Sequence, residues 1–237
     1  MTIGGFGLKA AVLVGGYGKR LRPLTDAKPK PLLEVAGKPI LGWQIEWLKK
    51  CGVNEMVLCV GYLKEKIIEH VGGGNRFGLK VGYVVEENPL GTGGALRNAE
   101  AFLKSDDKFL VVNGDIITNL DPARMVDEIS DSVGVIALVP LKSPFGIVDT
   151  DEEGFARRFR EKPIIPEYWI NAGVYCFKPE IFSYLPEKGN IETVTFPKLA
   201  KESKLKAFKY QDVFWKSIET QKDMEEAEAS LKTMQSS

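Results

Sequence analysis

Histidine is almost absent from this sequence, which has one, His70, in 237 residues. His70 lies in the stretch 63–71, whose apolar positions recur at helical spacing and leave the imidazole on the solvent side or at a helix end. A serine or cysteine triad built on histidine needs that imidazole beside the nucleophile. We therefore expect no such triad, and we expect any chemistry to depend on charge and metal.

Cysteine and long apolar runs are also scarce. Cys51, Cys59 and Cys176 are widely spaced in apolar sequence, which favours reduced core thiols over a disulfide framework or a zinc site. No apolar run approaches the roughly 18 residues that could span a bilayer. The first residues, Met1 to Gly7, lack the charged start and the long apolar centre of a signal peptide. We expect a cytoplasmic protein without a membrane or nucleic-acid partner.

Apolar runs alternate with helical periodicities through the first half of the chain. The runs predicted as strands are 9–14, 56–60, 79–85 and 109–113, and the stretches predicted as helices are 39–51, 63–71 and 92–104. This order predicts the α/β class, with a Rossmann-like, doubly wound mixed sheet in three layers. Strand-like runs at 133–141, 146–149, 155–160 and 169–177 predict a small antiparallel flap. A charged helix at 221–233 follows, and we expect residues 1–237 to form a single domain.

A glycine-rich turn, Gly15-Gly16-Tyr17-Gly18, follows the first apolar run directly. Backbone amides that no side chain obstructs form an anion-binding concavity. Five cations come next, against the single acid Asp26; they are Lys19, Arg20, Arg22, Lys28 and Lys30. The segment predicts a phosphate-binding site, with a solvated basic loop as the alternative.

Two better-known glycine motifs do not fit this turn. A dinucleotide-binding fingerprint has a third glycine where this chain has Leu21, and a P-loop has Ser or Thr where this chain has Arg20. Prolines at positions 23, 29 and 31 exclude a continuous helix and favour an extended basic segment lying over a ligand.

Glycines and acids follow several predicted strands at their carboxyl ends, where open α/β sheets bind ligands. These residues are Gly15, Gly61, Glu86 and Asp115. Asp115 either caps the following turn or binds Mg²⁺, which prefers one or two carboxylates together with substrate phosphates and water. In the stretch 90–95, small residues before a predicted helix would let a base or ribose lie against the backbone. Taken alone, this pattern indicates only the start of a helix.

Polar residues also interrupt the apolar runs of the second half. Glu161 and Lys162 stand side by side before Pro163, and a surface ion pair is the simplest interpretation of them. Asn171 is a single amide in an otherwise apolar strand. A buried amide needs hydrogen-bond partners, and the hydroxyls of a sugar would supply them.

Eight short motifs follow one another along the chain. They are Gly15-Gly16-x-Gly-x-Arg20, Pro29-Lys30-Pro31, Leu90-Gly91-Thr92-x-Gly-Ala95, Gly114-Asp115, Phe145-Gly146-Ile147-Val148, Glu161-Lys162-Pro163, Asn171-Ala172-Gly173 and Phe196-Pro197-Lys198-Leu199. Each is weak alone, but in this order they resemble the sugar-1-phosphate nucleotidyltransferase family. The resemblance covers residues 8–228. It is strongest to the mannose-1-phosphate guanylyltransferase branch, and the heptose-1-phosphate guanylyltransferases are similar.

The resemblance implies an enzyme that uses a nucleoside triphosphate and a sugar 1-phosphate, with Mg²⁺ as cofactor. The catalytic set implied is Arg20, Lys30, Asp115 and Lys162, in which Arg20 holds the triphosphate, the lysines neutralise phosphate charge and Asp115 binds the metal. The nucleotide site implied comprises Gly15, Gly16, Glu86, Gly91 and Thr92. The sugar site implied comprises Gly146, Glu161 and Asn171.

Glu86 bears on which base is bound. Uridylyl and thymidylyl transferases of the family resemble one another in having Gln at this position. A carboxylate has only acceptors and matches the adjacent N1–H and N2–H donors of guanine, which favours GTP with a hexose 1-phosphate such as mannose 1-phosphate. Three alternatives stay open: a UTP- or dTTP-dependent glucose-1-phosphate enzyme, a heptose-1-phosphate guanylyltransferase, and a non-catalytic regulatory subunit that binds nucleotide sugars.

The chain departs from the family at Ser217. The family has a Trp-x-Asp motif here, whose Asp supplies a second carboxylate to the metal, whereas this chain has Trp215-Lys216-Ser217. Either Asp115 suffices together with phosphates and waters, or Glu219, two residues on, reaches the metal. We also expect no C-terminal left-handed β-helix of hexapeptide repeats, a domain found in many relatives. We expect that any homo-oligomer assembles without one.

Overall fold

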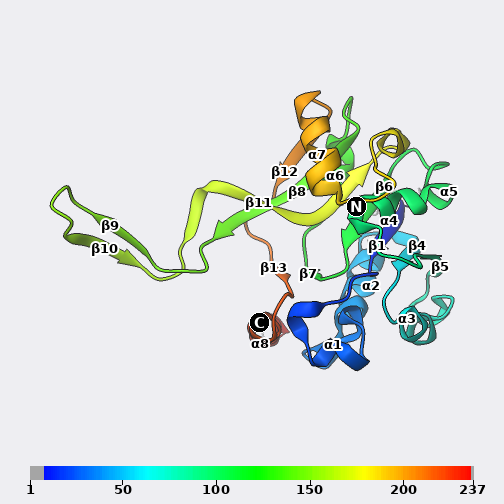
Figure 1. Ribbon diagram of the computed structural model, residues 1–237, viewed down its shortest axis with the longest axis horizontal. Helices are drawn as coiled ribbons and strands as arrows, with labels where there is room; N and C mark the ends of the chain where they lie inside the picture. The colour runs from blue at the N-terminus through cyan, green and yellow to red at the C-terminus, as the bar shows by residue number, and fades with distance from the viewer. Residues whose placement is uncertain (1–7, 236–237) are drawn as a thin grey trace.

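The computed structural model describes residues 8–235, and its centre is a seven-stranded sheet (Figure 1). In spatial order the strands are β12 (Leu205–Lys209), β8 (Gly134–Lys142), β11 (Ile164–Phe177), β6 (Phe109–Asn113), β1 (Leu8–Leu13), β4 (Val53–Val60) and β5 (Lys80–Val85). Neighbours from β6 to β5 are parallel, whereas β11 runs antiparallel to both β6 and β8. The predicted mixed α/β sheet is confirmed.

Helices cover both faces of this sheet. One face carries α2 (Ile40–Lys50), α3 (Lys64–Val71) and α6 (Ala123–Glu128); the other carries α4 (Gly91–Asn98), α5 (Glu100–Leu103) and α7 (Ile191–Lys201). The strands divide their side chains between these faces with the period of two that a pleated strand imposes. In β1, for example, Ala10 and Val12 pack on the α2 side and Ala11 on the α4 side.

A third apolar cluster joins the two ends of the chain. Helix α8 (Gln221–Gln235) packs Ala227 and Leu231 against Leu21 and Val35 of the segment that follows the glycine turn. The same region contains α1 (Leu24–Ala27) and two small antiparallel sheets, β2 (Glu34–Val35) with β3 (Lys38–Pro39) and β7 (Ile116–Thr118) with β13 (Trp215–Ser217). The basic segment is therefore held in place by the C-terminal helix.

The observed helices differ from the sequence prediction in several places. The helix predicted at 92–104 is divided at Ala99 into α4 and α5. Helix α7 was not predicted, because Pro197 lies inside it and proline, which has no amide hydrogen, is disfavoured in a helix interior.

The predicted antiparallel flap is a hairpin of β9 (Ile147–Thr150) and β10 (Ala156–Arg160), so the pairing of these strands is confirmed. The hairpin stands well away from the sheet and its helices, at the end of the long β8–β11 ribbon (Figure 1). It therefore does not cover the sheet as a flap would.

All three cysteines are unpaired, as predicted, and Cys59 and Cys176 are buried. Burial, followed by the nearby Glu86 carboxylate, raises the pKa of Cys59 to about 12. Among residues 8–235, no helix has both the length and the apolar character that crossing a membrane requires. The prediction made from Met1–Gly7 concerns residues outside the described range.

Candidate functional site

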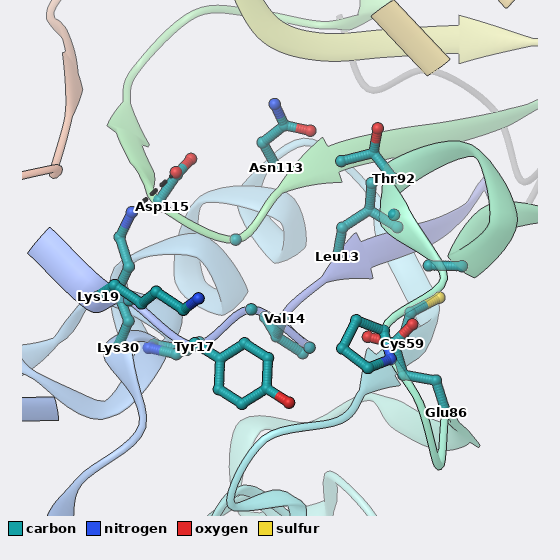
Figure 2. Close-up of a pocket in the computed structure, with 18 of the residues that line it drawn as sticks. Leu13, Val14, Tyr17, Lys19, Lys30, Cys59, Glu86, Thr92, Asn113 and Asp115 are labelled. Atoms are coloured by element: carbon teal, nitrogen blue, oxygen red, sulfur yellow. Dashed lines mark hydrogen bonds and ion pairs between the residues drawn. The ribbon is translucent and has the colours of Figure 1, made fainter. Parts of the chain in front are cut away.

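A pocket of about 490 Å³ opens at the carboxyl ends of β1, β4 and β6. Its lining includes most of the residues that the motifs single out: Gly15, Gly16, Arg20, Lys30, Glu86, Gly91, Thr92, Asp115 and Glu219. Figure 2 shows Lys30 and Asp115 at one end and Glu86 at the other, with Tyr17 and Val14 between them. The glycine turn, the 86–92 segment and the loop after β6 thus meet in one place.

Two cations and two carboxylates form a cluster at one end of the pocket. Lys30 Nζ lies 2.9 Å from Asp115 Oδ2 and 3.5 Å from Glu219 Oε2, and its side chain is only 12% exposed. A guanidinium nitrogen of Arg20 lies 3.0 Å from the same Glu219 oxygen. The cluster holds both signs of charge within contact distance, so it can bind phosphates through its cations and a metal ion through its carboxylates.

The turn that bears Asp115 is fixed from several sides. The buried side chain of Gln44, on α2, donates from Nε2 to the carbonyls of Asn113 and Ile116, at 2.8 and 3.0 Å. The amide of Ile218 donates to the carbonyl of Asp115 at 2.8 Å. A Cβ on Gly114 would lie 2.4 Å from the carbonyl oxygen of Leu13, so only glycine fits there. These contacts hold Asp115 at a defined position next to Lys30.

The carboxylate pair of Asp115 and Glu219 fits a magnesium ion. Burial raises the pKa of the Glu219 carboxyl; Lys30 opposes this effect and the adjacent Asp115 adds to it. Two neighbouring carboxylates, with phosphates and water as further ligands, are the oxygen donors that Mg²⁺ prefers. Within residues 8–235 there is no group of three or more metal-binding side chains. Substrate oxygens and water would therefore have to complete the coordination.

The other end of the pocket is built around Glu86. Its Oε2 accepts a hydrogen bond from the amide of Leu90 at 3.1 Å. A Cβ on Gly15 would lie 2.2 Å from Glu86 Oε1, and a Cβ on Gly61 would lie 2.8 Å from it. Glycine at these two positions is therefore what lets the carboxylate lie against the backbone of the turn. Burial raises the pKa of Glu86, although the Leu90 amide opposes the change.

The raised pKa of Glu86 predicts a pH-dependent effect of Glu86→Gln on stability. The Glu86 carboxyl stays protonated to a higher pH in the folded state than in the unfolded state. Ionisation of Glu86 therefore lowers the free energy of unfolding as the pH rises above 4.5, the ordinary pKa of a glutamate. We expect the variant to match the parent in acid and to be more stable than the parent near neutral pH. Urea unfolding of both proteins from pH 4 to 8 measures this; a difference that is constant across the range would contradict it.

The glycines of the 90–95 motif pack against another loop of the protein. The amides of Gly93 and Gly94 donate to the carbonyl of Gly189, and a Cβ on Gly91 would lie 2.7 Å from Asn190 Oδ1. Thr92 Oγ1 donates to Glu192 Oε2 at 2.7 Å. Their small size is thus required by this packing, whatever they also offer to a base or ribose. Asn190, which lines the pocket, was missed because it lies about a hundred residues from Thr92 in the chain.

A buried tyrosine, Tyr175, connects β11 to the start of α7. The Tyr175 hydroxyl accepts a hydrogen bond from Asn171 Nδ2 at 2.9 Å and donates to Glu192 Oε1 at 3.4 Å. Asn171 Oδ1 accepts from the amide of Gly173 at 2.9 Å. Asn171 was expected to find its hydrogen-bond partners in sugar hydroxyls. In this conformation Tyr175 and the Gly173 amide are its partners instead.

Four predicted site residues lie outside the lining of the pocket: Gly146, Glu161, Lys162 and Asn171. Three of them belong to the segment that carries the β9–β10 hairpin. Glu161 and Lys162 form no ion pair with each other or with any other charged residue within 8–235, so the surface ion pair, the alternative to a functional role, is absent. Lys162 has a φ of +45°, in the left-handed region that a lysine rarely adopts.

The chain matches the nucleotidyl transferase family over residues 9–234. It is 36% identical over 230 residues to a mannose-1-phosphate guanylyltransferase of Mycobacterium tuberculosis, covering 94% of this chain and 64% of the relative. It is 38% identical over 224 residues to the mannose-1-phosphate guanylyltransferase catalytic subunit beta of Dictyostelium discoideum, covering 91% and 62%. The chain therefore spans less than two thirds of the length of these relatives.

Solved structures give a match of nearly full length. HddC from Yersinia pseudotuberculosis, complexed with GMP-PN, aligns with a TM-score of 0.75 at 29% identity, over 94% of this chain and 99% of that one. HddC, a protein of similar length, therefore shares the fold described above.

Proposed function

Because this chain belongs to the nucleotidyl transferase family, we propose that it joins GTP to a hexose 1-phosphate to give a GDP-sugar and pyrophosphate. The hexose phosphate we favour is mannose 1-phosphate, the substrate named for the relatives from M. tuberculosis and D. discoideum. The observation that carries the proposal is the make-up of one pocket, with an acceptor for the base at one end and a mixed-charge cluster for the phosphates at the other.

The reaction is a displacement at phosphorus. An oxygen of the sugar phosphate forms a bond to the α-phosphorus of GTP, the bond between that phosphorus and the bridging oxygen to the β-phosphorus breaks, and pyrophosphate leaves with the electron pair. The attacking oxygen is already an anion, so no general base is needed. Positioning and charge neutralisation carry the catalysis, and Arg20 and Lys30 supply the positive charge at the triphosphate.

Asp115 and Glu219 would hold the magnesium ion, which when bound neutralises phosphate charge as the displacement proceeds. Lys30 then has two functions. Its ammonium holds the two carboxylates in place, and it presents a positive charge to the transferred phosphate. We further propose that the enzyme acts in the cytoplasm, where nucleoside triphosphates are available.

Glu86 supports guanine as the base. Glu86 lines the pocket, and its Oε1 has no hydrogen-bond partner among the described residues, whereas Oε2 is held by the Leu90 amide. A fixed acceptor suits the adjacent N–H donors of guanine, whereas uracil and thymine place a carbonyl on each side of one N–H.

The function is tested by pyrophosphate release with Mg²⁺ and a matrix of GTP, ATP, UTP and dTTP against mannose 1-phosphate, glucose 1-phosphate and a heptose 1-phosphate. We expect the highest kcat/KM for GTP with mannose 1-phosphate. Higher turnover with UTP or dTTP would overturn the assignment of the base. Binding of GDP-mannose without release of pyrophosphate from any pair would indicate a sensor instead of an enzyme.

Base preference gives a sharper test through Glu86→Gln. An amide offers a donor as well as an acceptor, so we expect the ratio of kcat/KM for GTP to that for UTP to fall by about tenfold or more. Glu87→Gln is the matched control, because Glu87 is 78% exposed and, among the described residues, pairs with Lys64 at the surface. An equal change in both variants, or in neither, would contradict the role of Glu86.

A further inference from the structure

Tyr17 is the one aromatic residue among the described residues that line the pocket. It lies within the glycine turn, and the motif of that turn does not specify the residue at this position. Its side chain is 41% exposed, and Figure 2 shows the ring between the Lys30–Asp115 end of the pocket and Glu86. The turn therefore offers an aromatic ring to whatever lies between the two ends.

The hydroxyl of Tyr17 makes no hydrogen bond within residues 8–235, and neither does that of Tyr168. The other five of the seven tyrosines each donate a hydrogen bond from the hydroxyl to another group of the protein; they are Tyr62, Tyr83, Tyr175, Tyr184 and Tyr210. Tyr168 is 64% exposed on β11, outside the lining of the pocket. Tyr17 is thus a pocket residue that the protein neither buries nor binds through its hydroxyl, and its ring is available to a ligand.

The turn that carries Tyr17 is held on both sides. The amide of Tyr62 donates to the carbonyl of Gly15 at 3.1 Å. Thr25 Oγ1 donates to the carbonyl of Gly18 at 3.0 Å, and Gly18 has a φ of +61°. The Tyr62 ring also packs beside the Tyr17 ring, with centroids 5.0 Å apart. The Tyr17 ring is therefore positioned by the protein, so a ligand that contacts it has less conformational entropy to overcome.

The chemistry of the ring suits a planar base better than a phosphate. The face of an aromatic ring carries partial negative charge, so it disfavours an anion and favours the flat surface of another ring. Lys19 Nζ lies 5.6 Å from the centre of the Tyr17 ring, and this exposed lysine makes no ion pair within the described residues. It is free to turn toward a phosphate. Leu13 and Val14 add apolar surface to the same pocket.

We propose that the ring of Tyr17 stacks on the base of the bound nucleotide while Glu86 holds the edge of the same base. Stacking favours a purine over the smaller pyrimidine, whatever its hydrogen-bonding groups, and the Glu86 carboxylate then selects the N–H donors of guanine. Tyr17 is thereby a specificity-determining residue for the nucleotide. This role rests on the proposed function, in which the base lies at the Glu86 end of the pocket.

Binding without a sugar phosphate separates the base from the phosphates. Calorimetric titration in Mg²⁺ gives the dissociation constants of GTP, UTP and inorganic tripolyphosphate for the wild type and Tyr17→Ala. We expect Tyr17→Ala to weaken GTP binding about tenfold, to weaken UTP binding less, and to leave tripolyphosphate binding within about twofold. A residue that only shapes the turn would affect all three ligands alike, because the turn amides meet the phosphates. An equal loss for all three, or no loss for GTP, would overturn the proposal.

Two further variants test whether the ring itself makes the contact. Tyr17→Phe keeps the ring and removes a hydroxyl that has no partner, so it should restore most of the GTP affinity that Tyr17→Ala loses. Tyr168→Ala is the matched control, since it removes an exposed tyrosine outside the pocket and should change none of the three constants. A loss in Tyr17→Phe as large as in Tyr17→Ala would overturn stacking, and so would an equal loss in Tyr168→Ala.

Turnover distinguishes this proposal from the proposed function. In an active enzyme we expect Tyr17→Ala to raise the KM for GTP about tenfold with a smaller effect on kcat, because the base is held equally in the ground state and the transition state. A KM for GTP that is the same in both proteins would overturn stacking and leave the proposed function intact. Protein that binds GTP through Tyr17 but releases no pyrophosphate with any sugar 1-phosphate would support stacking and overturn the proposed function.

Discussion

Replacing Lys30 with methionine is expected to lower kcat/KM by about 10²–10⁴-fold, because a fixed cation aimed at developing charge supplies several kcal/mol of transition-state stabilisation. Lys30 contacts Asp115 and Glu219 and is largely shielded from water. In the proposed reaction, its loss removes the charge opposite the transferred phosphate, and it also leaves two carboxylates close together. Since Lys30 lowers the pKa of Glu219, the variant should also need a higher pH to ionise that group. Steady-state pyrophosphate release between pH 6 and 9 measures both effects.

Lys28→Met provides the matched control for this experiment. Lys28 belongs to the same basic segment, but it is 43% exposed and its partner is the exposed Glu34, at 2.8 Å. Surface pairs of this kind contribute little, so we expect kcat/KM within about twofold of the wild type. If both lysine variants lost activity equally, Lys30 would contribute only to the general positive potential of the segment.

The parallel part of the sheet could be predicted from the sequence because each of its strands and helices has a local pattern of apolar residues. Buried strands read as short apolar runs, and the predicted strand 109–113 has the same bounds as β6. Helix α2 follows from the spacing of its apolar residues. Helix α7 could not be predicted this way, because the stability of a helix that contains Pro197 comes from Ile191, Phe196 and Leu199 packing on the sheet. Packing of that kind is decided by residues far away in the chain.

The gathering of Gly15, Glu86 and Asp115 in one pocket was predictable for a related reason. Gly15, Glu86 and Asp115 each follow a strand of one parallel sheet, and the carboxyl ends of such strands lie at a common edge. Asn190 and Glu192 gave no such signal, since they reach Thr92 from the start of a helix that the pattern did not reveal. The β9–β10 hairpin is a further case. The pairing of β9 with β10 is local and was predicted, but where the hairpin lies depends on contacts outside it.

The Asp115–Glu219 pair gives the other large expected effect. Asp115→Asn should reduce kcat/KM by about 10²–10⁴-fold, because a neutral amide is a weaker ligand for Mg²⁺ and no longer balances Lys30. Glu219→Gln should cost less, about tenfold, and should raise the Mg²⁺ concentration needed for half-maximal rate. Glu225→Gln, an exposed acid on α8, is the control and should change neither value. Titrating Mg²⁺ at saturating substrates measures these shifts.

The double variant decides whether the two carboxylates act on one ion. If Asp115 and Glu219 bind the same metal, removing the second after the first should change the rate much less than removing it from the wild type, because the ion is already weakly held. Independent, multiplicative losses would place Glu219 in the charge network of Arg20 and Lys30 alone. An unchanged Mg²⁺ requirement in Glu219→Gln would lead to the same conclusion. Asp115 with phosphates and water would then be sufficient, and Ser217 would mark a site that works with a single carboxylate ligand.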